Sequence, residues 1–280
     1  MSNQIKTILF MGILSALLIG FGYLIGPSYA WIFTLVAIAM NLVGYFYSDK
    51  IVLKMHNARE ITPSEHPNVH RLVHELSIKA EIPKPRIFWI DDPSPNAFAT
   101  GRNPQNGIVA VTDGLVRLVS ERELKGVLAH EIAHIKNRDI LIATLASTMA
   151  IAISHVSNII QWSSIFGSNR SNDEDSGPNP LLMAFIAPIA ATLIQLAISR
   201  SREYMADQLG AQLTSDPKSL ASALLKLEEY SEQRSGHLTQ EPATASLFIV
   251  NPFAGAEGIL RLFSTHPPIK ERVRKLQELY

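Results

Sequence analysis

Long apolar stretches alternate with two polar blocks along the chain, and this pattern predicts where its main helices lie. Asp, Glu, Lys and Arg are all missing from residues 7–48, 140–169 and 176–199. A helix that spans a membrane needs about 20 consecutive, mostly apolar residues. The first stretch is therefore long enough for two spanning helices, and each of the others is long enough for one.

The pattern thus predicts four membrane spans. They are expected near residues 5–25, 29–47, 140–161 and 180–199, and the first pair turns at Gly26-Pro27-Ser28. The two polar blocks, 48–139 and 200–280, then lie on the same side of the membrane.

Two other interpretations of the apolar stretches stay open. Ser28-Tyr29-Ala30 resembles the cleavage site of a signal peptide, although another apolar stretch follows it at once. Ser, Thr and Asn residues interrupt the third stretch, and Pro188 would kink the fourth. These last two stretches could instead be buried helices of a soluble core, or segments that enter the membrane only part of the way.

The polar blocks predict helices together with a few short strands. An amphipathic helix is expected over residues 67–79, where apolar side chains recur on one side. Strands are expected at 86–90, 96–100 and 107–111, where β-branched and aromatic residues lie between turn residues. The second block is expected to be helical through about Tyr230 and to close with a helix from about Ile269. The fold class is therefore mainly α with a small β-sheet (α+β).

Charge sets the expected orientation in the membrane and limits the classes of function. Lys and Arg gather in the two polar blocks and at Lys6, whereas only Arg170 lies elsewhere. Because cytoplasmic segments carry the excess of basic residues, both termini and both blocks are expected in the cytoplasm. A formal net charge of +0 gives no reason to expect nucleic-acid binding. The chain has no cysteine, so any metal must be held by His, Asp or Glu.

The polar block before the third apolar stretch carries a metal-binding pattern, His130-Glu131-Ile132-Ala133-His134. Ser120 and Glu123 form an S-x-x-E capping box ahead of it, which predicts a helix that ends near Asn137. On a helix the two histidines lie one turn apart on one face. They can hold one Zn²⁺ while Glu131 serves as a general base.

A catalytic zinc needs a third protein ligand, and the residues that follow the second apolar hairpin offer one. A third histidine at the spacing of the metzincins is excluded, because Ile140 stands there. Glu203 comes directly after the fourth stretch, and Asp207 shares its helix face and can orient a ligand histidine. A hairpin of the third and fourth spans would bring Glu203 beside His134. The alternative is a solvated, charged turn at the end of a membrane helix.

Other residues of the chain are weaker candidates for metal ligands. His66, His70 and His74 also recur at steps of four, but no acidic partner is evident, so an amphipathic surface helix is the favoured interpretation. His155 lies within the third apolar stretch, where an ionisable residue is a functional candidate by default. Asp139 is too close along the chain to His134 to be a comfortable third ligand.

Several motifs together resemble those of the M48 family of membrane zinc metallopeptidases. The resemblance covers essentially the whole chain, with no departure at a metal or base position. It rests on His130–His134 with Asn137-Arg138-Asp139, Arg202–Asp207 after two membrane segments, Pro95–Gly101, and Ser264–Pro268.

The resemblance implies a gluzincin-type metalloprotease domain on four transmembrane helices. One Zn²⁺ per chain would be held by His130, His134 and Glu203, with Glu131 as general base. Asn96 and Ala97 would lie on the edge strand that lines the substrate cleft. His266 would lie near the active site, with Arg272 as a companion; a structural role before the Pro267-Pro268 turn is the alternative for His266.

The implied organisation has four parts and a quality-control function. The parts are two transmembrane helices (1–47), a cytoplasmic protease part with the edge strand and the His-Glu-x-x-His helix (48–139), a transmembrane hairpin with an outward loop at 162–179 (140–199), and a second cytoplasmic protease part with the third ligand (200–280). The expected activity is cleavage of misfolded membrane proteins at the cytoplasmic face of the bacterial inner membrane. The partners are the lipid bilayer and those substrates, and no oligomeric state is predicted.

Two other functions stay open. A narrower M48-type peptidase could trim prenylated C-termini, although four spans argue against the larger membrane chamber that such an enzyme uses. A catalytically idle, zinc-binding membrane adaptor would keep the motif without the activity. The intact base and three plausible ligands argue against that alternative.

Overall fold

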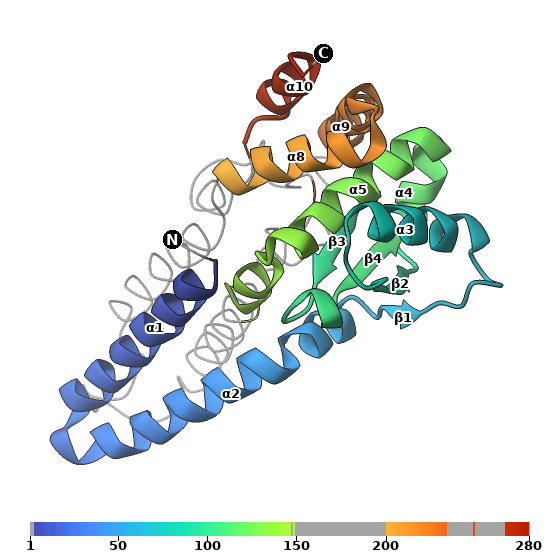
Figure 1. Ribbon diagram of the computed structural model, residues 1–280. Coiled ribbons are helices and arrows are strands. Elements are labelled where there is room, and N and C mark those ends of the chain that lie inside the picture. The colour runs from blue at the N-terminus through green and yellow to red at the C-terminus, as the bar shows by residue number, and fades with distance from the viewer. Residues whose placement is uncertain (1–2, 147, 149–199, 234–248, 250–266, 280) are drawn as a thin grey trace, which may run out of the picture.

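The computed structural model describes residues 3–146, 148, 200–233, 249 and 267–279. Most of the third predicted span, all of the fourth, the loop at 162–179, His155 and His266 lie outside the described residues. Within those residues the chain is mainly helical with a small four-stranded sheet, as the sequence predicts (Figure 1).

The N-terminal segment, residues 3–55, is a helical hairpin that projects from the rest of the molecule (Figure 1). α1 (Asn3–Ile25) and α2 (Ala30–Met55) are joined by a short 3-10 turn at Pro27–Tyr29, where a turn is predicted. The α2 helix continues past the predicted limit at residue 47, because Val52 and Leu53 in its last turns are buried against the sheet. The end of the hairpin is therefore packed into the part of the chain that contains the sheet.

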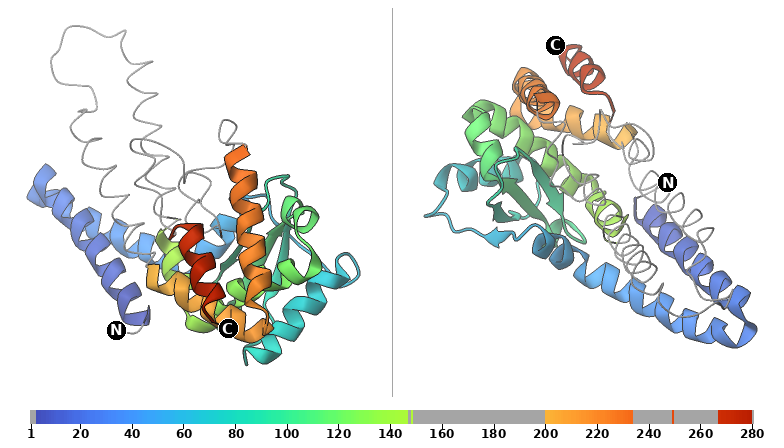
Figure 2. Two further views of the ribbon diagram at one scale, coloured as in Figure 1. Left: turned by 90° about the horizontal axis from the view of Figure 1, so that it is seen from above. Right: turned by 180° about the vertical axis from the view of Figure 1, so that it is seen from behind.

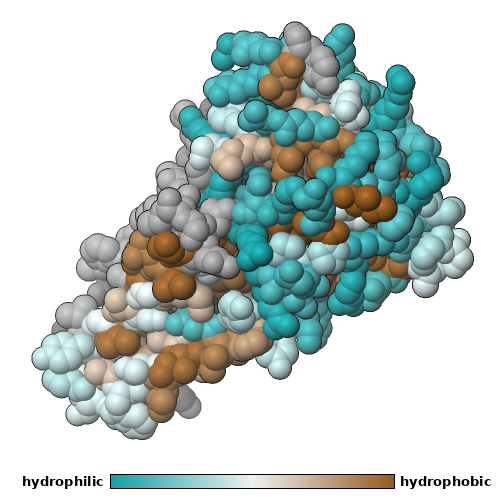
Figure 3. Space-filling view, in the orientation of Figure 1, coloured by the Kyte–Doolittle hydropathy of each residue, from teal (hydrophilic) through white to brown (hydrophobic). Residues whose placement is uncertain are grey.

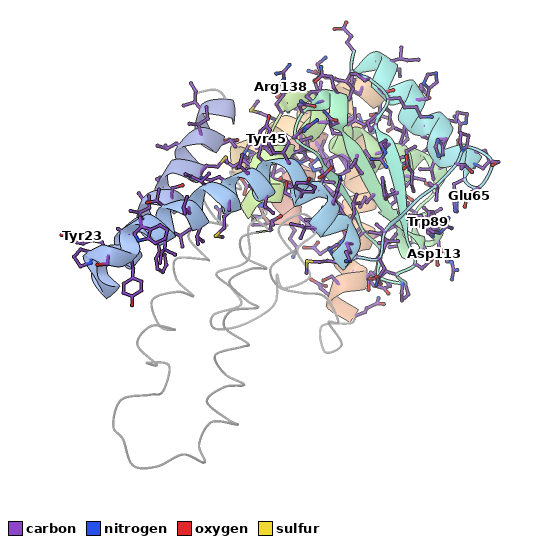
Figure 4. All side chains as sticks on the ribbon, turned by 90° about the horizontal axis from the view of Figure 1, so that it is seen from below. Tyr23, Tyr45, Glu65, Trp89, Asp113 and Arg138 are labelled. Carbon is purple, nitrogen blue, oxygen red and sulfur yellow. The ribbon has the colours of Figure 1, made fainter. Side chains whose placement is uncertain are left out.

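The hairpin exposes apolar side chains over much of its surface. Ile8 is 71% exposed and Trp31 63% exposed, and Figure 3 shows brown and beige patches among paler residues on this arm, while the other end of the molecule is mostly teal. Figure 4 places Tyr23 at the tip of the arm, far from Trp89 in the sheet. Residues 27–55 are the one stretch within the described part of the chain that is long and apolar enough to cross a membrane. Such a surface suits lipid contact.

The sheet has four strands in the order β1-β2-β4-β3. The strands are β1 (Arg59–Glu60), β2 (Arg86–Ile90), β3 (Ala97–Thr100) and β4 (Ile108–Thr112). β2 and β4 are parallel, whereas β1 and β3 are antiparallel to their neighbours. β3 thus forms one edge of the sheet, where the sequence predicts an edge strand.

Both faces of the sheet are covered, so its strands are apolar along their length rather than alternating. One face, which includes Ala97 and Ala99, packs in the main core with α3 (Pro67–Lys79) and α5 (Glu121–Asn137). The opposite face, which includes Phe98 and Ile108, packs against the end of α2 and against Ala143. α4 (Asp113–Leu118) joins β4 to α5.

Three further helices cover α5 on the side away from the sheet. They are α8 (Arg200–Thr214), α9 (Pro217–Gln233) and α10 (Ile269–Gln277), and both views in Figure 2 place α10 beside α8 and α9. The predicted helix through Tyr230 is interrupted, because Ser215 has a φ of 53 and Pro217 starts the next helix. α5 therefore lies between the sheet and a helical layer.

Candidate zinc centre

The α5 helix carries the histidine motif through the centre of the molecule, and the sequence explains where it begins and ends. Ser120 and Glu123 form the predicted capping box. The helix ends at Asn137 because Arg138 adopts a left-handed conformation, with φ 56. His130 is 1% exposed and Glu131 3% exposed, so the motif is buried and does not form a surface pair of histidines.

The α8 helix crosses α5 at very short range, which brings Glu203 to the histidines. A Cβ added at Gly210 would lie 3.1 Å from the backbone nitrogen of His130, so only glycine fits without a shift. Figure 1 shows the orange α8 lying above the green α5, at an angle to it. The crossing explains how Glu203, which is far from the motif in sequence, reaches the two histidines.

His130, His134 and Glu203 form a group that can hold a metal ion. One ligand atom from each lies within 4.8 Å of the others. The Nε2 atoms of the two histidines are 3.1 Å apart, and the Glu203 carboxylate lies 3.7 Å from Nε2 of His130 and 3.5 Å from Nε2 of His134. These are the three residues that the sequence analysis assigns to zinc.

His130 is oriented by a carboxylate that is itself held by an arginine. Its Nδ1 lies 2.9 Å from Oδ1 of Asp207. Arg272 donates to both oxygens of Asp207, at 2.8 and 2.7 Å, and to the carbonyl of Ile249 at 3.0 Å. Burial alone would raise the pKa of Asp207, but the charge and hydrogen bonds of Arg272 lower it to about 2. The carboxylate is thus ionised and accepts a hydrogen bond from the Nδ1–H group of His130.

His134 is oriented by a different carboxylate, which the sequence analysis considers only as a metal ligand. Its Nδ1 lies 3.1 Å from each oxygen of Asp139. Burial alone would lower the pKa of His134, but Asp139, Glu203 and Glu131 raise it to about 10. Asp139 is brought within reach by the left-handed turn at Arg138, and its place just after the motif is the signal that could have found it.

The donor set fits a zinc ion. Asp207 and Asp139 are hydrogen-bond acceptors at the two Nδ1 atoms, so in a metal-bound site each neutral imidazole would keep its proton there and offer the lone pair of Nε2 to the metal. Without a metal, the raised pKa of His134 keeps a proton on its ring beside Glu203, and a bound Zn²⁺ would take the place of that positive charge. Two His nitrogens and a Glu oxygen are a usual set for catalytic zinc, which leaves one coordination position open.

Glu131 lies beside this group and touches the edge strand. Its carboxylate accepts a hydrogen bond from the backbone of Ala99 in β3. Burial raises its pKa to about 8, an effect to which Glu203 adds and which His134 opposes. Among the described residues, the group that can hold a metal ion does not include Glu131, whose carboxyl group contacts the sheet edge instead.

The free edge of β3 is occupied by side chains. Hydrogen-bonded pairs alternate along an antiparallel ladder, and the backbone N–H of Thr112 donates to the carbonyl of Asn96 at 3.0 Å. The N–H groups of Ala97 and Ala99 therefore point away from β4. Oδ1 of Asn96 accepts from Ala97 at 3.0 Å, and Glu131 accepts from Ala99. The strand begins at Ala97, one residue later than predicted, so Asn96 directly precedes it and its side chain caps the first residue.

Other candidate residues are placed differently. His66 stacks on Trp89, with ring centroids 3.8 Å apart, and Nε2 of His70 lies 3.0 Å from the carbonyl of Ile61, so these rings are used in packing and hydrogen bonding. Arg202 is only 6% exposed, so the start of α8 is not the solvated, charged turn that is the alternative for this segment. Its Nη1 has no hydrogen-bond partner among the residues that the structure describes.

Comparisons with known proteins agree with this site. Residues 63–280 match peptidase family M48. A protein named "Protease HtpX homolog" from Pelotomaculum thermopropionicum is 50% identical, over 99% of this chain and 99% of that protein. Proteins of the same name from Desulfatibacillum aliphaticivorans (49%, over 99% and 89% of the two chains) and Pyrococcus furiosus (48%, over 98% and 95%) are also similar.

A solved structure supports the fold. The crystal structure of S. mikatae Ste24p has a TM-score of 0.52 at 19% identity, and the match covers 98% of this chain. It covers 65% of that chain, so this protein spans about two thirds of the length of that structure. With its zinc-binding His-His-Glu site and its apolar N-terminal hairpin, the molecule is a membrane zinc metalloprotease of the HtpX type, and the chain belongs to peptidase family M48.

Proposed function

We propose that the protein is an endopeptidase that cleaves misfolded or damaged membrane proteins at the cytoplasmic face of the bacterial inner membrane, with Glu131 as its general base. The observation that carries the proposal is the position of Glu131. Its buried carboxylate lies between the zinc-binding group and the edge strand, within reach of both. A base is needed at that point if a peptide lies along the strand and its scissile carbonyl reaches the metal.

The residues around the site divide the chemistry among them. Zinc, when bound to His130, His134 and Glu203, supplies a Lewis acid that polarises the carbonyl and acidifies water. Glu131 accepts the proton of the attacking water and then delivers it to the leaving amine. Asp207, with Arg272, and Asp139 keep the imidazole protons on Nδ1, so that both Nε2 atoms remain ligands.

The edge strand is the proposed binding place for an extended substrate. The carbonyl groups of Ala97 and Ala99 point away from β4 and can accept hydrogen bonds from a peptide backbone. The amide of Asn96, which now caps Ala97, would turn to admit the peptide. Recognition through the backbone needs no particular sequence, which suits unfolded segments of many different proteins.

The membrane arrangement extends the same proposal. The exposed apolar surface of α1 and α2 anchors the chain in the bilayer. The basic residues of the two polar blocks favour the cytoplasm for the zinc centre and for both termini. Substrates would be membrane proteins whose unfolded cytoplasmic segments reach the centre from the same surface.

Substitution of the proposed base tests the assignment. Glu131→Gln removes a proton acceptor but no metal ligand, so we expect about one zinc per chain and a loss of casein cleavage of roughly 100-fold or more. Zinc content and peptide release are measured on the full chain in detergent, beside wild type. Glu121→Gln is a matched control, because Glu121 lies on the same helix but is exposed and ion-paired with Arg71.

The outcomes separate the alternative functions. Cleavage by Glu131→Gln at the rate of Glu121→Gln would contradict the role of Glu131. A wild-type protein that binds zinc but releases no peptides would indicate the idle adaptor. Cleavage confined to the C-terminal residues of prenylated peptides would indicate the narrower peptidase. Full zinc occupancy in Glu203→Ala would place the third ligand elsewhere.

A further inference from the structure

We propose that Thr144 is a positioning residue for proteolysis: it holds the end of β3 so that the Ala99 backbone meets Glu131. Thr144 lies in the helix that follows Asp139, at the start of the third predicted membrane span. The inference rests on the proposed role of Glu131 as general base. It concerns a contact outside the zinc ligands and the residues that orient them.

The contact is a hydrogen bond between two buried hydroxyl groups. Oγ1 of Thr100 and Oγ1 of Thr144 are 2.9 Å apart, and both residues are 0% exposed. Thr144 has a single hydroxyl proton, which it donates to the carbonyl of Ile140 at 2.7 Å. Thr100 must therefore be the donor between the two hydroxyl groups. Without an oxygen at position 144, the Thr100 proton loses this acceptor.

The hydrogen bond lies where β3 has the least support from the sheet. β3 pairs with β4 on one side only, and Thr100 is its last residue. Gly101 follows with a φ of 125 and turns the chain away, and a Cβ there would lie 2.2 Å from the carbonyl oxygen of Asn106. An edge strand that ends in a sharp turn depends on side-chain contacts for its sideways position.

The two faces of β3 reach two different helices. Successive side chains of a strand point to opposite faces. Ala97 and Ala99 belong to the core that contains α5, whereas Phe98 packs on the opposite face beside Ala143. Thr100 lies on that opposite face and meets Thr144. The strand is therefore held between the helix of the proposed base and the helix that starts at the membrane.

The position of Thr100 bears on Glu131 through one peptide unit. Ala99 is its direct neighbour, and the Ala99 N–H is the group that Glu131 accepts from. A shift at the end of the strand therefore moves the donor at the base. A misplacement of about 1 Å can lower a catalytic rate by roughly 100-fold.

The helix that contains Thr144 also contacts the N-terminal hairpin. A Cβ added at Gly44 of α2 would lie 2.9 Å from Cδ2 of Leu145, the residue after Thr144. Asp139 at its beginning lies against His134. The helix thus contacts α2, a zinc ligand and the edge strand within seven residues, 139–145.

Removal of the hydroxyl tests the proposal. Thr144→Val keeps the shape of the side chain, so we expect full zinc content and a kcat lower by about 10-fold to 100-fold, with KM changed by less than about threefold. Thr144→Ser keeps the oxygen and should retain the wild-type kcat. Thr148→Val is the matched control, because Thr148 lies one turn further on and donates only to the carbonyl of Thr144.

A second variant separates positioning from stability. Thr100→Val combined with Thr144→Val leaves no unpaired hydroxyl, so thermal stability should return toward wild type. If Thr144 positions the strand, kcat stays low in this double variant. A kcat that recovers with stability would overturn the proposal, and so would a wild-type kcat in Thr144→Val or an equal loss in Thr148→Val. A wild-type rate in Glu131→Gln would be a different failure, because it would contradict the role of Glu131 as general base, on which the proposal for Thr144 rests.

Discussion

The two zinc-binding histidines belong to one helix, but they are held in different ways. His130 meets Asp207 of α8, which Arg272 of α10 holds with two hydrogen bonds. His134 meets Asp139, which lies five residues further along the same chain segment. The first arrangement needs three helices that are distant in sequence, and the second needs one turn of backbone.

The difference is also one of charge balance. Arg272 is 0% exposed and faces Asp207 directly, so charge is compensated inside the protein. On the other side, the buried Arg202 interacts electrostatically with Asp139, but no ion pair joins the two among the described residues. Burial lowers the pKa of Arg202, whereas Asp139 and Glu203 raise it. The His130 side therefore links zinc binding to assembly of the whole domain, whereas the His134 side depends on local geometry.

Asp207→Asn should have the largest effect. It removes the closest counter-charge of the buried Arg272 guanidinium and leaves only the Glu203 carboxylate at 3.7 Å, and the loss of one partner of a buried ion pair costs about 3–5 kcal/mol. The orienting acceptor for His130 weakens too, so zinc affinity should fall by roughly 10-fold to 100-fold. Thermal unfolding of the metal-free chain and chelator competition measure the two effects.

A double variant separates these two effects. Asp207→Asn with Arg272→Met removes both charges, so stability should recover toward wild type. Zinc affinity should remain low, since His130 still lacks a carboxylate. If both variants unfold like wild type, the His130 arrangement does not link the metal to the fold, and the contrast with His134 disappears.

Glu123 shows what a buried carboxylate contributes away from the metal. Burial alone would raise its pKa, but hydrogen bonds from Lys226, Ser222 and Ser120 lower it to about 2. A carboxyl group whose folded pKa is depressed stabilises the protein above its unfolded pKa, near 4.5. That stability should disappear as the pH falls from about 5 toward 2.

Glu123→Gln should therefore be less stable than wild type by about 1–3 kcal/mol at pH 7. Its difference from wild type should shrink as the pH falls, and unfolding measured at a series of pH values would show this. The zinc affinity of the variant should be unchanged at pH 7. A difference that stays constant with pH would mean that Lys226 and Ser222 do not depend on the ionised form.

Asp139→Asn should have the smallest effect of the three. The Asn side chain can still accept from His134, and no buried arginine is left unpaired in direct contact, so stability should change by less than about 1 kcal/mol. Zinc affinity should fall by about 10-fold, because a neutral acceptor supports the ligand less well. An equal loss of stability in Asp139→Asn and Asp207→Asn would show that the two sides are equivalent.

The parts of the site that could be predicted from sequence are those defined by a short local pattern. The capping box and the spacing of His130 and His134 define α5, and the position of Glu203 after an apolar hairpin brings the third ligand within reach. The partner strand order could not be predicted, because β4 inserts between β2 and β3. Local patterns carry no information about which strands pair.

The contacts that orient the ligands were harder to predict. The helix face that Asp207 shares with Glu203 predicts that it orients a ligand histidine, but not that it pairs with Arg272, which is 65 residues away and has no periodicity in common with it. Asp139 is near His134 in sequence, but it reaches His134 only because the backbone at Arg138 is left-handed. That conformation is uncommon for residues other than glycine, so the sequence does not predict it. Likewise, the capping pattern predicted that Glu123 meets Ser120 but not that it reaches Ser222 and Lys226 on α9.

The α2 helix sets how far the zinc centre can stand from the lipid. It has 26 residues, so it is about 39 Å long, against about 30 Å for the hydrocarbon layer. Its last turns are fixed to the sheet by Val52 and Leu53 and cannot act as a flexible tether. In the proposed arrangement, a cytoplasmic loop would need only a few extended residues, at about 3.3 Å each, to reach from the bilayer surface to the protease part. A short cytoplasmic loop of a membrane protein would therefore be long enough to reach the protease part, and a longer soluble domain would gain no advantage in reach.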